Sequence, residues 1–335
     1  MGRSENEPDC QAGPPRFPLF VKRVFAARAP RAGWRVNLFF KNAKPEKSDN
    51  LIGILLMLGA MAAFAVEDTF IKKLSAGMGT GQILIILGVG GYAIFALIAL
   101  RNGQALFSRD LLARPVMLRN FGEIIGTSGY VLAVVLTPLS SASAILQATP
   151  LAVALGAALF LGQAVGWRRW LAISIGFIGV LIVIRPGLEG FKPASLFAVQ
   201  GVIGLSIRDL ATRTIPGRVS SMVLSAYGFG VVAPVGFFML AFEGPLVLPD
   251  TAQSWYIFGA LVVGPIGYYM IVAAMRIGEV AVVTPFRYVR LVFAMILGVL
   301  VFGEVLDFWT LTGAGIIIAT GLFTIYRERM ARKSL

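Results

Sequence analysis

The sequence predicts an all-α integral membrane protein with ten transmembrane helices, arranged as two inverted repeats of five helices. Three observations support this prediction. The chain is 57% hydrophobic and only 14% charged, whereas a soluble domain carries about 25% charged residues. Its apolar segments are about as long as a helix that crosses the core of a bilayer, which has roughly 20 residues. The two halves of the chain also align on each other at one constant offset.

The apolar segments are continuous runs, unlike the alternating strands of about ten residues in a porin-type barrel. They predict helices rather than strands, and several connections are only a few residues long, so consecutive helices are expected to be antiparallel neighbours. The predicted helices span residues 51–71, 82–100, 117–137, 140–162, 169–184, 194–214, 219–242, 254–275, 278–303 and 308–326.

The formal net charge of +13 fits Lys and Arg in cytoplasmic loops better than nucleic-acid binding. With the N-terminus in the cytoplasm, the outer connections hold four basic residues, namely Lys72, Lys73, Arg185 and Lys192. The cytoplasmic side holds thirteen beyond residue 50. This bias predicts that both termini lie in the cytoplasm. We expect the membrane to be a bacterial-type inner membrane. The thirteen are Arg101, Arg109, Arg114, Arg119, Arg168, Arg169, Arg213, Arg218, Arg276, Arg327, Arg329, Arg332 and Lys333.

Residues 1–50 hold ten Lys or Arg and five Asp or Glu, and contain no apolar stretch of signal-peptide length. We expect a basic, disordered cytoplasmic tail. The single cysteine, Cys10, rules out an internal disulfide. Histidine is absent, which removes the commonest proton shuttle and metal ligand.

No nucleotide-binding motif, metal-ligand cluster or nucleophile–histidine pair is found in the sequence. We therefore expect neither cofactor nor metal, and no enzyme activity. An intramembrane enzyme that uses carboxylates and a non-transporting scaffold remain as alternatives, which solute flux into vesicles would separate from a carrier. Without a nucleotide site, the energy for transport must come from a coupling ion or from the substrate gradient.

An internal repeat links the two halves at an offset of 141 residues. Asp68 falls on Asp209, Lys72 falls on Arg213, and LFLGQ (159–163) falls on LVFGE (300–304), so Gln163 meets Glu304. Because each half has five predicted helices, the second half enters the membrane upside down relative to the first. Inverted repeats with a site between them at the bilayer midplane are a transporter architecture.

Three segments resemble the EamA-type members of the drug/metabolite transporter superfamily. FRYVRLVFAMILGVLVFGEVLDFWTLTGAGIIIATGLFTIYRE (286–328) resembles the end of the second family repeat, with a Gly-Glu after an apolar helix. LTPLSSASAILQATPLAVALGAALFLGQ (136–163) resembles the same part of the first repeat, and GILLMLGAMAAFAVEDTFIKKLS (53–75) resembles the first helix, which ends in lysine. Two features depart from the family pattern: Gln163 replaces a frequent Glu, and the second helix lacks an arginine near its start.

The resemblance implies two EamA-like repeats, residues 51–187 and 192–327. It implies a secondary transporter that moves a small metabolite across the inner membrane by alternating access. Members include uptake carriers for vitamins and nucleoside-like metabolites and exporters of amino acids, so export of metabolites or drugs is the alternative. The expected partners are a small-molecule substrate, the lipid bilayer and a coupling ion, without nucleic acid.

Ionisable residues within the predicted helices mark either a transport pathway or internal ion pairs. Arg287 and Arg290 lie three residues apart near the middle of the ninth helix, so they share a face. Either they bind an anionic or carbonyl-rich group of the substrate, or they neutralise Glu123 or Asp68. Tyr288 and its repeat counterpart Gln147 complete the predicted centre of the site.

Two further pairs are related by the repeat and are candidates for gates or for structural ion pairs. Glu67 and Asp68 lie toward the outer end of the first helix, while Arg208 and Asp209 lie toward the inner end of the sixth. Pro285, in Thr284-Pro285, predicts a kink beside the site. The candidates for aromatic walls with hydroxyl groups are Tyr92, Tyr130, Tyr268 and Tyr269.

Overall fold

In the computed structural model, every regular element of the described residues is a helix. The described residues are 47–161, 166–188, 191–215, 219–278 and 280–333. The expected tail of residues 1–50 lies outside them, except for 47–50, which begin the first helix. The helices are α2 Lys47–Leu74, α3 Thr80–Arg101, η1 Arg109–Leu112, α4 Arg114–Leu136, α5 Leu139–Leu146, α6 Thr149–Phe160, α7 Trp167–Ile184, α8 Ser195–Thr212, α9 Ser221–Gly230, α10 Ala233–Glu243, α11 Thr251–Ile277, α12 Val280–Val283, η2 Thr284–Tyr288, α13 Val289–Phe302 and α14 Phe308–Lys333.

Eight helical segments in the described part of the chain are long and apolar enough to cross a membrane. Five are α2, α3, α7, α11 and α14, and the other three join shorter helices, namely α5 with α6, α9 with α10, and η2 with α13. Large apolar side chains, including Phe238, Trp255 and Leu300, are exposed, and such exposed apolar surface is typical of contact with lipid. The chain is a multi-pass membrane protein.

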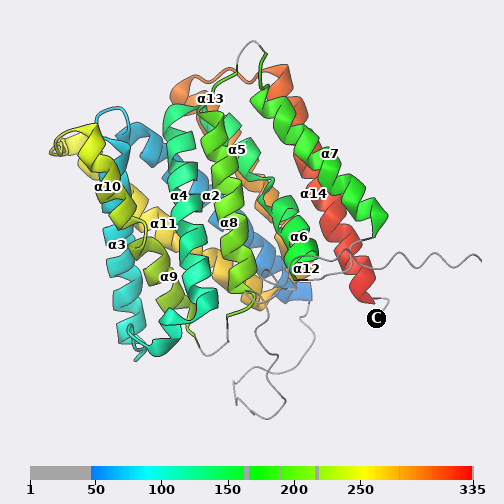
Figure 1. Cartoon of the computed structure of the whole chain (residues 1–335), viewed down its shortest axis with the longest axis horizontal. Helices are drawn as coiled ribbons and strands as arrows, with labels where there is room; N and C mark the ends of the chain where they lie inside the picture. The colour runs from blue at the N-terminus through cyan, green and yellow to red at the C-terminus, as the bar shows by residue number, and fades with distance from the viewer. Residues whose placement is uncertain (1–46, 162–165, 189–190, 216–218, 279, 334–335) are drawn as a thin grey trace, which may run out of the picture.

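Two further long helices, α4 and α8, are not among the eight segments. They have 23 and 18 residues, but each carries ionisable residues within its length. They stand side by side in the bundle (Figure 1). Gly204 of α8 lies so close to α4 that a methyl group added to it would be 2.2 Å from the backbone nitrogen of Gly126. The total of ten transmembrane helices therefore stays a prediction, in which α4 and α8 are the two additional spans.

Three pairs of helix starts repeat at the offset that the sequence predicts. Helices α3 and α9 begin at residues 80 and 221, α5 and α12 at 139 and 280, and α7 and α14 at 167 and 308. Each pair is separated by 141 residues. The repeat is thus present in the positions of these helix starts as well as in the amino-acid sequence.

Matching helices of the two halves pack against each other in opposite directions. The beginning of α3 at Gly81 lies against Gly236 of α10, and its middle at Gly91 lies against Phe229 of α9. The contacts between α3 and the α9–α10 segment therefore run in reverse order along the two segments, as they do in an antiparallel pair.

Helices α7 and α14 form a second antiparallel pair at the opposite flank of the bundle (Figure 1). Gly176 of α7 faces Thr320, and Gly179 faces Gly313. These small residues permit close helix approach.

The bundle has two ends that differ in what they hold. The beginning of α2 and the end of α14 lie at one end, at the bottom of Figure 1, which we name the terminal end. The opposite end holds Leu74, the last residue of α2, and Phe302, the last residue of α13, and we name it the latch end for the contacts described below.

Candidate functional site

Two helices at matching positions of the repeat are broken in the middle. The predicted span 140–162 is two helices, α5 and α6, with Gln147 and Ala148 between them. Its counterpart 278–303 divides into α12, the 3-10 turn η2 and α13. A proline lies at the start of α6 and another in η2, and proline cannot donate the backbone hydrogen bond that continues a helix. The kink predicted at Pro285 is confirmed.

The two broken helices touch each other at their interruptions. The side-chain nitrogen Nε2 of Gln147 donates a hydrogen bond of 3.1 Å to the backbone carbonyl of Arg287. Backbone groups freed inside a membrane need such partners. Contact between discontinuous helices of the two halves is the arrangement in which many transporters build their substrate site.

A central cluster of polar side chains joins the first half to the second half. The Arg290 guanidinium binds both carboxylate oxygens of Asp68, at 3.0 and 2.8 Å. The Tyr130 hydroxyl donates to the same carboxylate at 2.8 Å and lies 3.4 Å from the Ser143 hydroxyl. The guanidinium also lies 5.2 Å from the ring centroid of Phe64. Asp68 is thus the partner of Arg290, and Glu123 is not.

Glu67 stands next to this cluster on α2. Its carboxylate faces Gly264 of α11, and in the described chain it makes no hydrogen bond or ion pair within 4.0 Å. The region around Arg290 therefore contains two carboxylates and one guanidinium.

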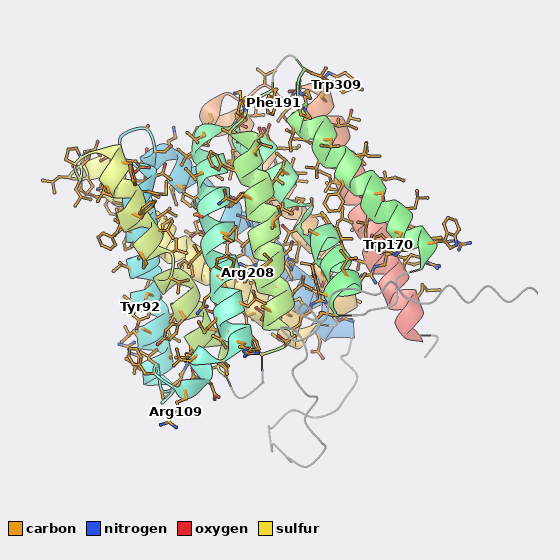
Figure 2. The ribbon with its side chains drawn as sticks, viewed as in Figure 1. Tyr92, Arg109, Trp170, Phe191, Arg208 and Trp309 are labelled. Carbon is orange, nitrogen blue, oxygen red and sulfur yellow. The ribbon has the colours of Figure 1, made fainter. Side chains whose placement is uncertain are left out.

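The second predicted pair belongs to a separate cluster between α4 and α8. Arg208 pairs with Asp209 at 2.8 Å and with Glu123 at 3.4 Å. Arg119 lies 3.6 Å from Glu123 and is buried, although the sequence analysis assigned it to the cytoplasmic surface. Arg208 is seen on α8 in Figure 2. We refer to Arg119, Glu123, Arg208 and Asp209 as the α4–α8 cluster.

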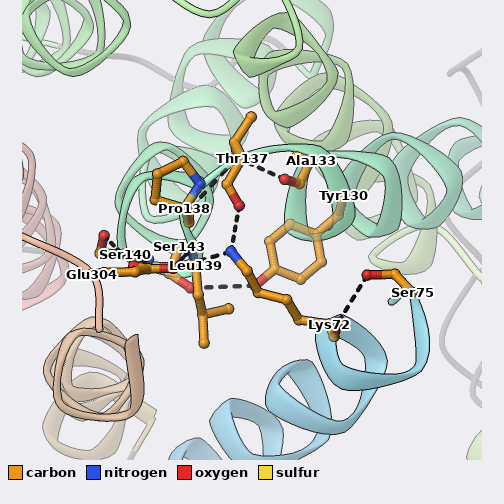
Figure 3. Close-up of polar contacts among 10 residues, drawn as sticks. All are labelled: Lys72, Ser75, Tyr130, Ala133, Thr137, Pro138, Leu139, Ser140, Ser143 and Glu304. Carbon is orange, nitrogen blue, oxygen red and sulfur yellow. Dashed lines mark hydrogen bonds and ion pairs between the residues drawn. The ribbon is translucent and has the colours of Figure 1, made fainter. Parts of the chain in front are cut away.

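A third set of contacts closes the latch end of the bundle (Figure 3). The Lys72 ammonium pairs with Glu304 at 3.0 Å and donates to the Thr137 carbonyl at 2.6 Å. Glu304 also accepts the backbone N–H of Leu139 at 2.5 Å, and both the backbone N–H and the hydroxyl of Ser140, at 3.0 and 2.7 Å. Lys72, Leu139, Ser140 and Glu304 are named the latch.

The local backbone explains how Glu304 reaches the beginning of α5. Gly303 ends α13 with a φ of 62°, a left-handed conformation that glycine adopts without steric cost. The following N–H, that of Glu304, bonds back to the Gly298 carbonyl at 3.0 Å. The carboxylate then caps the first turn of α5, where free backbone N–H groups favour an anion.

The latch also sets the acidity of its carboxyl group. Burial alone would raise the pKa of Glu304, but the hydrogen bonds from Ser140 and Leu139 and the charge of Lys72 outweigh burial and hold that pKa below the ordinary value. The Glu304 carboxyl therefore stays ionised and holds the two halves together at neutral pH.

A cavity of about 110 Å³ lies toward the terminal end, among α6, α7, α8, η2 and α14. The charged side chains that line it are those of Arg169, Asp209, Arg213 and Arg287. Arg287 is thus directed to a different environment from that of Arg290, although the two residues lie three positions apart.

The remaining predicted aromatic residues are spread over the bundle. Tyr288 is buried and packs against Gly321. Tyr92 contacts the ring of Tyr227 at the flank formed by α3 and α9, and Figure 2 shows it well apart from Arg208. Tyr268 stacks edge-on against Phe95 in the same apolar region, and Tyr269 is exposed.

Sequence reasoning missed the latch and two of the cavity arginines as functional residues. Lys72, Arg169 and Arg213 were counted only as charges on the two membrane surfaces. The sequence nevertheless contained a signal that links these residues, because the repeat aligns Lys72 with Arg213 and Glu304 with Gln163.

Comparison with known proteins identifies the family. The model of the EamA-like transporter family matches residues 51–185 and 192–326, one match in each half. The chain belongs to the EamA-like transporter family. Family membership confirms the resemblance noted from the sequence, and it makes the protein a transporter rather than an enzyme.

Curated relatives carry different substrates in different directions. The S-adenosylmethionine uptake transporter of Rickettsia conorii is 26% identical over 84% of this chain and 95% of its own length. The riboflavin transporter of Vibrio cholerae is 28% identical over 86% of this chain and 97% of its own. The pseudopaline exporter of Pseudomonas aeruginosa is 25% identical over 83% of this chain and 96% of its own.

One solved crystal structure, described only as that of a protein, shares the fold. It aligns with a TM-score of 0.57 at 20% identity, and covers 83% of this chain and 98% of its own. The relatives together support a transporter of small metabolites.

Proposed function

We propose that the protein is a secondary transporter that moves a small metabolite by alternating access, with its substrate site between two inverted repeats. The observation that carries the proposal is the meeting of the two broken helices at Gln147 and Arg287, next to the ion pair between Asp68 and Arg290. These contacts cross from one half to the other. A change in the relative tilt of the halves must therefore rearrange them.

The proposed repeats are residues 51–187 and 192–327, related by a twofold axis in the membrane plane. The antiparallel packing of α3 with α9 and α10, and of α7 with α14, supports this inversion, since each pair consists of matching helices. The inversion exchanges the two ends of the bundle, so a gate at one end has a counterpart at the other.

In the proposed cycle, the latch is the closed gate on the outer side. The Lys72–Glu304 pair and the cap on α5 hold the halves together there, while the cavity at the terminal end faces the cytoplasm. Of the 13 basic residues assigned to the cytoplasmic side, Arg119 is buried, and the bias of the other twelve to four supports the assignment of the terminal end to the cytoplasm. A periplasm-active reporter fused after Leu335 should stay dark in bacterial cells, and an active reporter there would overturn this orientation.

The proposed substrate contacts are the central cluster, the side chains of Gln147 and Arg287, and the neighbouring Tyr288. Tyr92 and Tyr268 stay in the proposal as aromatic walls that would reach the pathway in another conformation. The groups proposed for gating or ion pairing are Glu67, Asp68, Glu123, Arg208 and Asp209. The pair of Glu67 and Asp68 and the pair of Arg208 and Asp209 occupy equivalent positions in the two halves. The names of the relatives suggest a nucleoside-like, vitamin-like or amino-acid-like metabolite.

Transport can be tested with purified protein in liposomes. A thermal-shift screen that includes S-adenosylmethionine and riboflavin selects compounds that raise the melting temperature. Liposomes preloaded with a selected compound should then accumulate its radiolabelled form by exchange, and protein-free liposomes should not. A compound that stabilises the protein but is never exchanged would make the protein a binding protein and would contradict the proposal.

The site is tested with Arg290→Gln in the same liposomes. Loss of exchange together with a normal melting temperature supports substrate contact by Arg290. A lowered melting temperature that the second substitution Asp68→Asn restores would assign the pair to stability alone.

A further inference from the structure

The cavity at the terminal end contains more positive than negative charge. Its lining holds three guanidinium groups, those of Arg169, Arg213 and Arg287, and one carboxylate, that of Asp209. The carboxylate is already engaged by Arg208 at 2.8 Å. Asp209 is thus shared between a close partner outside the lining and the cavity arginines, and it offsets only part of their charge.

Two of the three arginines have no ion-pair partner within 4.0 Å among the residues that the structure describes. These are Arg213, exposed just after the end of α8, and Arg287, half-buried in η2. A charge at membrane depth is unfavourable unless it is paired or solvated. Because Asp209 offsets only part of the charge, Arg287 favours water or a ligand anion in the cavity.

The repeat shows where a protein carboxylate is missing. Lys72, the counterpart of Arg213, pairs at the latch end with Glu304. The position equivalent to Glu304 in the first half is Gln163, whose placement lies outside the described residues. The chain thus has a carboxylate for the cation at the latch end. At the corresponding sequence position of the first half it has a neutral amide.

The cavity has room for a small anion. A volume of about 110 Å³ is well above the 10–15 Å³, roughly, that one water molecule needs in the same measure. A carboxylate or a phosphate group fits this space. The planar donor fork of arginine matches both of these anions.

We propose that this cavity is an anion subsite that binds the carboxylate or phosphate group of the transported metabolite when the protein is open toward the terminal end. The inference rests on the proposed function, because it makes the anion part of a transported substrate. It assigns roles to Arg169 and Arg213 in addition to Arg287. The rest of the substrate lies toward the central cluster, where the carboxyl group of Glu67 favours a cationic or donor group. The substrate class is therefore a metabolite with an acidic group at one end.

The test measures the melting temperature of purified protein in nanodiscs of phosphatidylcholine as sodium phosphate or sodium acetate is added. Sodium chloride at the same ionic strength is the reference, so that screening is removed from the comparison. We expect a saturable rise in melting temperature with phosphate or acetate. Arg213→Gln should weaken the apparent affinity by about tenfold or more, as loss of one charge-assisted hydrogen bond does.

Arg109→Gln is the matched control, because Arg109 is an exposed arginine that projects from the same end of the bundle and lies outside the cavity (Figure 2). Its apparent affinity should equal that of the wild type. Arg287→Gln should weaken binding as Arg213→Gln does, and serves as the second variant if Arg213→Gln does not fold.

Three results would overturn the inference. The first is a melting temperature that follows ionic strength alone. The second is equal anion affinity in the folded Arg213→Gln, Arg287→Gln and Arg109→Gln proteins. The third is stabilisation by phosphatidylglycerol in the nanodisc without any response to free phosphate or acetate, which would assign the cavity to a lipid headgroup. Anion binding is measured without transport, so its failure leaves the exchange assay of the proposed function independent.

Discussion

Replacing Glu304 by glutamine is the sharpest perturbation of the proposed outer gate. One oxygen of Glu304 accepts from Lys72 and Leu139, and the other accepts from two groups of Ser140. The lysine and glutamate side chains are only 16% and 9% exposed. Glutamine has one acceptor oxygen, and its NH₂ group cannot accept a backbone N–H.

Glu304→Gln therefore leaves at least one partly buried N–H or the Lys72 ammonium without its partner. An unsatisfied buried donor destabilises a structure by about 1–3 kcal/mol, and bonds to charged groups lie at the upper end of that range. We expect a loss of about 2–3 kcal/mol from the latched conformation, which increases the population of the unlatched form by about 30- to 150-fold.

Alkylation of a buried cysteine measures this shift. Ser143 is 1% exposed and lies on α5 beneath the latch. In a Cys10→Ser, Ser143→Cys background in nanodiscs, the rate of reaction with a water-soluble maleimide reports the population in which this position is accessible. The rate should rise in proportion to the unlatched population in Glu304→Gln. Ser140→Ala, which removes only one of the four donors, should raise it by less.

Asp307→Asn is the matched control in the same connection. Asp307 pairs with Arg185 and accepts the backbone N–H of Thr310, but its side chain is 41% exposed. Exposed ion pairs contribute about 0–1 kcal/mol, so the labelling rate should change by only a few-fold. An unchanged rate in folded Glu304→Gln, or an equal rise in both variants, would refute the assignment of the latch as a gate.

Three further predictions concern the buried contacts. Arg290→Gln leaves Asp68 buried without its cation and should lower the free energy of unfolding by about 3–5 kcal/mol if the pair is structural, a loss that the double variant with Asp68→Asn should largely reverse in denaturant titrations. Gly204→Ala should destabilise the protein by about 1–3 kcal/mol through overpacking against α4, while Gly315→Ala, where the added methyl group meets nothing within 4 Å, should be neutral in the same titration. The melting temperatures of wild type and Glu304→Gln should differ most above pH 4.5, the ordinary pKa of glutamate, and converge as the pH falls through the lower folded pKa of Glu304. The reason is that only the ionised carboxylate makes the stabilising contacts of the latch. A difference that stays constant with pH would contradict this prediction.

The sequence alone determined the solvent of this protein and the order of its helices. Long apolar runs of this kind need a membrane as their solvent. In water they would expose more apolar surface than a fold of this length can bury. The offset of 141 residues also follows from the letters, since Asp68, Lys72 and the Gly-Glu segment at 303–304 have matching positions. Helix starts at 80 and 221, or at 167 and 308, repeat that offset.

The break at Gln147 and the choice of ion-pair partners were decided only by the tertiary structure, whereas Pro285 marked the other break in the sequence. The segments on both sides of the interruption at Gln147 are apolar, so hydropathy predicts one helix where the chain forms two. Arg290 had Asp68 and Glu123 as possible partners, and Lys72 looked like a surface charge. Which acid a cation meets depends on how α2, α4, α8 and α13 pack, because an ion pair needs atoms within about 4 Å and sequence spacing specifies such distances only within one helix.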